Sequence, residues 1–118
     1  MTRKRIIVEL GAGTALHGGN YTKAAVRAVQ DAIHHSSMSF LKSLRIPAAE
    51  MEVEVTIGVQ RPDMVDAEAV RTALPHGRII VKVVKGGLDV PDPEAADLCV
   101  IASAAVAVFV DMAKRGTA

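Results

Sequence analysis

The stretch LCVIASAAVAVFV, residues 98–110, decides the fold that the sequence predicts. Helix and strand assignments compete for it, but its valines, isoleucine and phenylalanine favour a strand, and both faces of that strand are apolar. The stretch is too short to cross a membrane, since a spanning helix needs roughly 20 residues. A strand that is apolar on both faces belongs in the interior of a sheet. We therefore expect the last strand of the chain to lie centrally.

Upstream of residue 98 the sequence alternates short strands and helices. Residues 51–59 alternate apolar and polar side chains, which is typical of a strand with one buried face. Val26, Val29 and Ile33 recur at helical spacing within residues 22–35, and Asn20 or Thr22 caps this helix. The other elements are a strand over 5–10 closed by Gly11 and Gly13, a short helix capped by Asp66, and a strand over 78–85 followed by the loop GGLDVPDPEAAD.

The order β-α-β-α-β-β within 118 residues predicts a single α+β domain, residues 1–118, built in two layers. Its sheet is mixed and four-stranded, with both helices on one face. The other face then exposes Ile7, Glu9, Ile80, Lys82 and Val84, together with half of the last strand. Such a surface is too apolar to face water, so we expect a homo-oligomer that associates through the sheet.

Composition excludes several functions. A formal net charge of +1 and an aromatic content of 3% provide neither the field nor the stacking surfaces that nucleic acids require, and no membrane partner is expected either. No apolar run follows the basic start MTRKR, so we expect no secretory signal, and with the single cysteine, Cys99, this favours a cytoplasmic protein. His34 and His35 would point about 100° apart on a helix, so they cannot easily share one ion, and we expect no metal site within one chain. A metal site shared between subunits is the alternative. We expect no cofactor.

Three segments, VELGAGTALHG, YTKAAVRAVQDAIHHSS and ASAAVAV, are similar to a family of short conserved hypothetical proteins first named from a Listeria reading frame. The order of elements resembles the trimeric Rid (YjgF-like) deaminases, the Bacillus-type chorismate mutases, and single repeats of cyanuric acid hydrolase and barbiturase. These resemblances imply a centrally inserted last strand, a trimer or a multiple of it, and sites between subunits. By analogy of fold, they imply hydrolysis or deamination of an amide-like or imine-like compound.

The segment LHGGNYTKAAVRAVQDAIHHSS, residues 16–37, concentrates glycines, basic groups and histidines at one strand-to-helix connection. It fits neither the phosphate-loop nor the dinucleotide pattern, because Gly19 and Leu16 stand where those need a lysine and a glycine. Backbone amides around residues 18–21, with Lys23, instead predict a pocket for a small polar or anionic metabolite. Alternatively, the glycines only form left-handed turns and the helix presents a solvated face. The candidate ligand-binding residues are Gly18, Gly19, Asn20, Arg27, His34, His35, Gly86 and Gly87.

Three residues are candidates for catalysis. His17 is the candidate acid or base, Lys23 the anion anchor or amine catalyst, and Glu9 a secondary carboxylate at the end of the first strand. Alternatively, Glu9 faces water or pairs with Lys82 across the sheet. The sequence thus predicts an enzyme that acts on a small molecule at subunit interfaces, with a noncatalytic ligand-binding or structural oligomer as the alternative.

Overall fold

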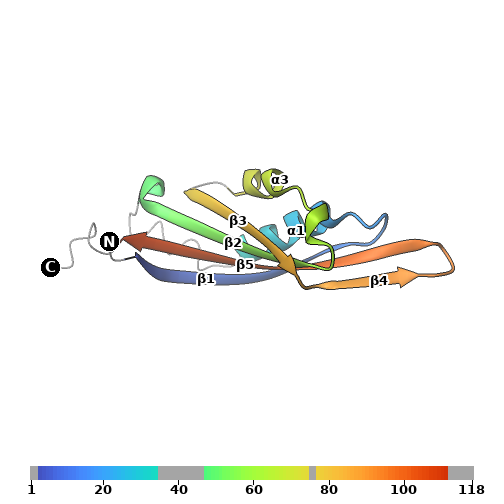
Figure 1. Cartoon of the computed structure of the whole chain (residues 1–118). Coiled ribbons are helices and arrows are strands. Elements are labelled where there is room, and N and C mark those ends of the chain that lie inside the picture. Colours follow the sequence, from blue (N-terminus) through green and yellow to red (C-terminus); the bar gives the residue numbers. More distant parts are fainter. Residues whose placement is uncertain (1–2, 35–46, 75–76, 112–118) are drawn as a thin grey trace.

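The sheet is mixed and contains five strands, and α1 and α3 pack on one of its faces (Figure 1). The computed structural model describes residues 3–34, 47–74 and 77–111. The chain forms an elongated body of 63 × 24 × 19 Å. In chain order the elements are β1 (Arg3–Ala15), α1 (Tyr21–Ile33), η1 (Ala48–Glu50), β2 (Met51–Val59), η2 (Pro62–Met64), α3 (Ala67–Thr72), β3 (Arg78–Lys85), β4 (Leu88–Asp92) and β5 (Asp97–Asp111). The predicted α+β two-layer class is confirmed.

β5 is the central strand, as its sequence predicts. It pairs antiparallel with β1 along one side and with β2 and β4 along the other, while β3 lies parallel to β2 at the sheet edge. The even-numbered residues from Val100 to Val110 are buried beneath the helices. The odd-numbered residues from Cys99 to Phe109 lie on the opposite, uncovered face, and most of them are half-buried. We call that uncovered surface the open face.

A fifth strand forms where the sequence predicts only a loop. Within GGLDVPDPEAAD, the residues of β4 pair with the start of β5 and make a hairpin that projects from the body of the sheet (Figure 1). Asp92 stabilises the turn, because its Oδ1 accepts hydrogen bonds from the amides of Glu94 and Ala95. Pro91 obscures the strand in the sequence, but an edge strand tolerates a residue without an N–H group.

β1 does not end at Gly11 and Gly13 but runs through both to Ala15. The two glycines instead let α1 lie directly against the strand. A Cβ atom on Gly11 would stand 2.4 Å from the carbonyl oxygen of Ala28, and one on Gly13 would stand 2.3 Å from that of Ala24. The prediction that these glycines close the strand is therefore wrong, because close helix–strand packing, not a turn, is what requires them.

A register shift between Arg5 and Ile7 exchanges the faces of β1. Arg5 lies opposite Phe109 on the open face, whereas Ile7 and Glu9 lie opposite Val108 and Val106, which are buried under the helices. The prediction that Ile7 and Glu9 occupy the open face is wrong, since an extra residue in a strand inverts the alternation beyond it. Val8 and Leu10 take their places there, exposed by 39% and 66%.

The helices follow the sequence closely. The side chain of Asn20 caps α1 by accepting a hydrogen bond from the amide of Lys23, and the buried alanines of α1 rest on β1 and β5. Asp66 caps α3 through the amides of Glu68 and Ala69. Val70 and Leu74 of this segment are buried, and Ala73 is half-buried.

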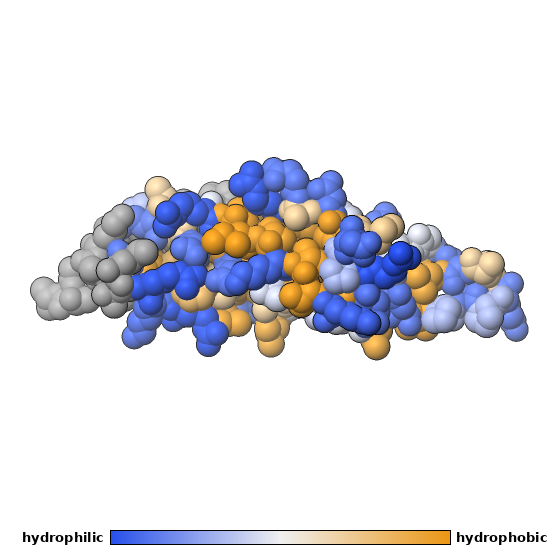
Figure 2. All heavy atoms as spheres, viewed as in Figure 1, coloured by the Kyte–Doolittle hydropathy of each residue, from blue (hydrophilic) through white to orange (hydrophobic). Residues whose placement is uncertain are grey.

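Hydrophobic residues reach the surface over the sheet (Figure 2). Three strands supply the exposed large apolar side chains of the open face, namely Val8 and Leu10 of β1, Ile80 and Val84 of β3, and Leu88 and Val90 of β4. Among the described residues, no helix is long and apolar enough to cross a membrane.

Candidate functional site

The candidate site lies where the loop before α1 meets the start of β5. His17 Nδ1 lies 2.8 Å from Asp97 Oδ2. Because the Asp97 carboxylate only accepts hydrogen bonds when ionised, Nδ1 carries the proton and donates it. In the neutral form of the ring, this tautomer makes Nε2 the acceptor, and the side chain of His17 is 84% exposed. The pair therefore presents an oriented base to solvent.

Asp97 is fixed by two further donors. The amides of Gly18 and Leu98 both donate to its Oδ1 at 2.8 Å. The bond from Gly18, then those from His17 and Leu98, lower the pKa of Asp97 to about 2. Gly18 reaches this position with φ of +78°, a left-handed conformation that glycine adopts without strain. Asp97 is therefore an anion at neutral pH, with its orientation fixed before any ligand arrives.

Two of the loop amides that the sequence assigns to a bound anion, those of Gly18 and Gly19, already have partners within the chain. Gly18 donates to Asp97, and the amide of Gly19 donates to the carbonyl oxygen of Leu98 at 3.0 Å. The Asn20 side chain occupies the amide of Lys23 at the helix start. The carboxylate that this glycine loop holds thus belongs to the chain itself, and the role of the loop is to position Asp97 and, through it, His17.

A second aromatic–carboxylate pair, Tyr21 with Asp89, connects α1 to β4. The buried Tyr21 hydroxyl donates to Asp89 Oδ2 at 2.5 Å. This bond, followed by burial, raises the pKa of Tyr21, so its phenol stays protonated at neutral pH. The other oxygen of Asp89, Oδ1, is buried and has no hydrogen-bond partner among the described residues. The pair ties the first turn of α1, and with it the glycine loop, to the hairpin.

The polar side chains of Lys23, Arg27 and Asp31 follow one another at four-residue spacing along α1. We call them the polar stripe of α1, and it has mainly a structural role. Arg27 donates to the carbonyl oxygen of Thr14 at 2.7 Å, and Asp31 accepts from the amide of Ala12 at 2.9 Å. Both contacts occupy polar groups on the free edge of β1, so Arg27 is engaged by the fold rather than held ready for a ligand. Lys23 is exposed in the first turn of α1, the end nearest His17.

The other predicted site residues do not come together with His17. Glu9 is half-buried in β1 opposite Val106, and its suggested partner Lys82 binds Glu54 instead. His34 is the C-cap of α1, and the length of the helix, about 20 Å, separates it from the first turn that contains Lys23. His35 lies outside the described residues.

Gly86 and Gly87 connect β3 to β4, and their backbone lies close to that of Gly58 and Ile101. The amide of Gly86 donates to the carbonyl oxygen of Val59, and the Gln60 side chain donates to the carbonyl oxygens of both glycines. A Cβ on Gly87 would stand 2.2 Å from the carbonyl oxygen of Ile101. The structure thus favours the alternative that these glycines form a tight connection.

Asp97 and Asp89 are the residues that sequence reasoning missed. Both lie in or beside the segment expected to be a loop, where acidic residues are ordinary. The alternation of Leu88 and Val90 with Asp89 is the signal that could have revealed a strand there. The pairing of β4 with β5 forms the hairpin that contains Asp97. There Asp97 contacts His17 in the segment that follows β1.

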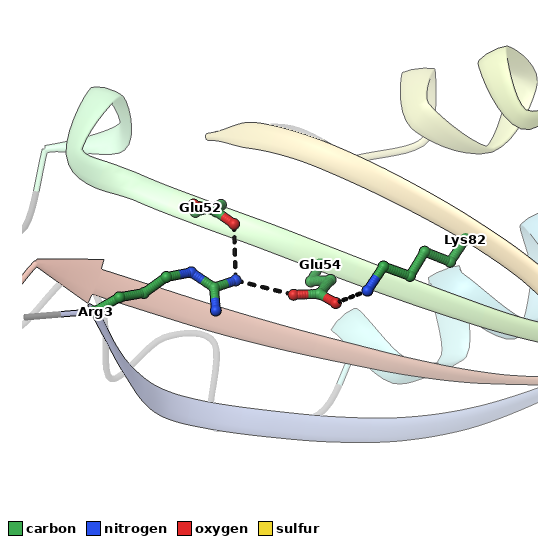
Figure 3. Close-up of polar contacts among 4 residues, drawn as sticks. All are labelled: Arg3, Glu52, Glu54 and Lys82. Atoms are coloured by element: carbon green, nitrogen blue, oxygen red, sulfur yellow. Dashed lines mark hydrogen bonds and ion pairs between the residues drawn. The ribbon is translucent and has the colours of Figure 1, made fainter.

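A separate cleft of about 270 Å³ lies at the opposite end of the sheet, lined by residues that include Arg3, Glu52, Arg78 and Phe109. Arg3 stacks over the Phe109 ring at 3.5 Å from its centroid and donates to Glu52 and Glu54, and Lys82 completes the chain of charges (Figure 3). These ion pairs lower the pKa of Glu54 and raise that of Arg3. The described residues contain no group of three or more His, Cys, Asp or Glu side chains able to hold a metal ion.

Fold and site together define a small α+β protein in which a two-layer scaffold presents a histidine–aspartate pair at a strand-to-helix loop. Residues 5–108 match the family described as "Conserved hypothetical protein (Lin0512_fam)", and the chain belongs to that family. This confirms the resemblance seen in three segments of the sequence. No curated protein matches the chain in sequence.

A solved structure from Nostoc punctiforme, described as a FtsZ-like protein of unknown function, is similar to this chain. The two are 38% identical, and the similarity covers 94% of this chain and 98% of that one, with a TM-score of 0.79. The fold therefore extends to a relative of nearly the same length.

Proposed function

We propose that the chain is a small-molecule enzyme in which His17 acts as general base, with Asp97 as its positioning residue, in the hydrolysis or deamination of an amide-like or imine-like compound. One observation carries the proposal, namely the 2.8 Å contact between His17 Nδ1 and an Asp97 carboxylate that backbone amides hold in place. Solvated histidines on a purely structural surface do not need a buttressed carboxylate behind them.

In the proposed reaction, Nε2 of His17 accepts a proton from a water molecule. The water oxygen forms a bond to the amide carbon, and the carbon–nitrogen bond then breaks. The proton on His17 passes to the departing nitrogen, which leaves as ammonia or an amine, while the carbonyl carbon becomes a carboxyl group. Asp97 remains ionised throughout and stabilises the imidazolium that forms between the two proton transfers.

The substrate class follows from the surroundings of His17. Lys23 is exposed at the first turn of α1, so a compact substrate that carries a carboxylate or another anionic group is favoured there. With 84% of the His17 side chain exposed, one chain encloses little of such a substrate. We propose that a second copy of the chain completes the enclosure, which places the site at a subunit boundary.

The test compares His17→Gln with His34→Gln, which changes an exposed histidine at the other end of α1. A panel of small cyclic amides, linear amides and imines bearing a carboxylate is screened for release of ammonia or amine. We expect His17→Gln to lower kcat at least about 100-fold and His34→Gln to leave it unchanged. Asp97→Asn is expected to lower kcat with KM unaltered, because Asp97 orients the base and does not bind substrate.

Two results would contradict this assignment. The first is a wild-type protein that turns over no member of the panel, which favours the noncatalytic alternative. The second is turnover that survives His17→Gln within a few-fold, which moves the chemistry to other residues.

A further inference from the structure

The open face contains an area of mainly apolar side chains toward its β4 end. We call this area the open-face patch. Its exposed apolar members are Val8 and Leu10 of β1, Val84 of β3, and Leu88 and Val90 of β4. The half-buried Ile101 and Ala105 of β5 and the exposed, polar Ser103 lie between them. The helices cannot cover the patch, since α1 and α3 both lie on the opposite face. Contiguous apolar area of this kind on a protein surface marks an interaction site.

The open face has the size of a protein–protein interface. The five strands contain 13, 9, 8, 5 and 15 residues, and at a rise of about 3.3 Å per residue and about 4.8 Å between strands they cover on the order of 800 Å². A standard interface buries about 800 Å² on each partner. The face of the sheet is therefore large enough to support stable association without further contacts.

Four charges of the open face neutralise one another. Arg3 contacts Glu52 and Glu54, and Lys82 contacts Glu54 (Figure 3). Glu54 is in register with Ala107, and Lys82 is in register with Thr56, so this group of charges borders the patch. The exposed Arg5 and Arg78 are in register with Phe109 and Glu52, at the end of the face away from the patch. Burial removes a charge from water at high cost unless a partner compensates it. Because these four charges compensate one another, an apposed surface needs to supply no counter-charge to them. A second copy of the same face carries the same self-compensated group. A partner with strong charge of one sign would gain no ion pair with this group.

The outer edge of β1 is blocked against strand pairing. Arg27 and Asp31 occupy the carbonyl oxygen of Thr14 and the amide of Ala12, which are groups that an incoming strand would need. Association along this edge is disfavoured, while association through the face remains open.

We infer that a second copy of this chain covers the open face, with the open-face patch at the centre of the contact. Symmetric homo-oligomers are built from such self-complementary surfaces, where the same residues meet from both sides. This inference can fail separately from the proposed chemistry at His17, because the residues that its test changes belong to the sheet and not to the loop before α1.

The test measures the mass of the protein by light scattering at micromolar concentration, for wild type, Leu10→Glu, Val84→Glu and the control Met64→Glu. Met64 belongs to η2, and its side chain is 52% exposed. Its carbonyl oxygen accepts a hydrogen bond from the Thr22 hydroxyl of α1, so Met64 lies on the helix side of the sheet. We expect a wild-type mass of at least twice 12.4 kDa, retained by Met64→Glu. Leu10→Glu and Val84→Glu each raise the dissociation constant at least about 100-fold, because each places uncompensated carboxylates in the contact.

A second measurement needs no substitution. Cys99 is the single cysteine and lies half-buried on the open face beside Val90. Its rate of alkylation should fall at least about tenfold as protein concentration rises through the range in which the mass increases. A monomeric wild type overturns the inference. So does an assembly in which Cys99 reacts at the same rate as in the dilute protein, even if the Glu variants fail to fold.

Discussion

At the scale of residues, the side chain of Asp97 connects two distant parts of the chain. It accepts from the amides of Gly18 and Leu98 and from the ring of His17, so it joins the loop before α1 to the start of β5. Sequence reasoning predicted His17 as a candidate acid or base, but it did not find the carboxylate that contacts its ring. The two residues are 80 positions apart, and only the β4–β5 hairpin and the pairing of β5 with β1 bring them together.

The first prediction at this scale is a pH effect on stability. The pKa of Asp97 is lowered in the folded chain from 3.8 to about 2, so its ionised form stabilises the fold above pH 3.8 and this contribution is lost as the pH falls through about 2. Wild type should therefore unfold at a higher temperature than Asp97→Asn near neutral pH. The difference should shrink as thermal melts are repeated from about pH 4 down to about pH 2. A difference that stays constant over this range would show that the stabilisation does not come from the ionised carboxylate.

At the scale of elements, the contact between β1 and α1 explains both the two glycines and the polar stripe of the helix. Gly11 and Gly13 bring the helix backbone onto the strand, and at that distance Arg27 and Asp31 reach the polar groups of the strand edge. The sequence shows the stripe but not its partner. A stripe that is solvated and a stripe that covers a strand edge have the same spacing, so periodicity alone cannot separate them.

Gly13→Ala tests this contact, because the added Cβ meets the carbonyl oxygen of Ala24 at 2.3 Å and neither backbone can move alone. We expect it to lower the free energy of unfolding by about 3 kcal/mol, as measured by urea denaturation. Gly18→Ala is the matched control, since a Cβ there meets nothing within 4 Å and the cost comes only from its φ of +78°. That cost is about 1 kcal/mol. Equal effects of the two substitutions would mean that α1 does not pack directly against Gly13.

At the scale of the whole molecule, β5 organises the sheet. Between residues 103 and 110 it is paired on both sides, by β1 and β2, and its even-numbered side chains fill the core beneath the helices. β3 and β4 have one unpaired edge each among the described residues, and β4 extends beyond the helix layer (Figure 1). Stability should therefore be distributed unevenly along the chain.

Amide hydrogen exchange measures this distribution. We expect the slowest exchange in the Ala104–Val110 portion of β5, where each strand neighbour must separate before the amides open. β4 should exchange fastest of the strands, because its pairing is limited to five residue positions at the tip of the sheet. Protection in β3 that exceeds the protection in β5 would contradict a fold organised around the last strand.

The sequence by itself determined the two-layer class, the central place of residues 98–110, and both helices with their caps. These depend on local periodicity, capping chemistry and apolar content, all of which act between near neighbours in the chain. Tertiary structure decided which side chains meet. The bulge near Ile6 that places Glu9 under the helices, the hairpin that delivers Asp97 to His17, and the seating of α1 on two glycines each arise from contacts between distant segments, and no local pattern encodes those.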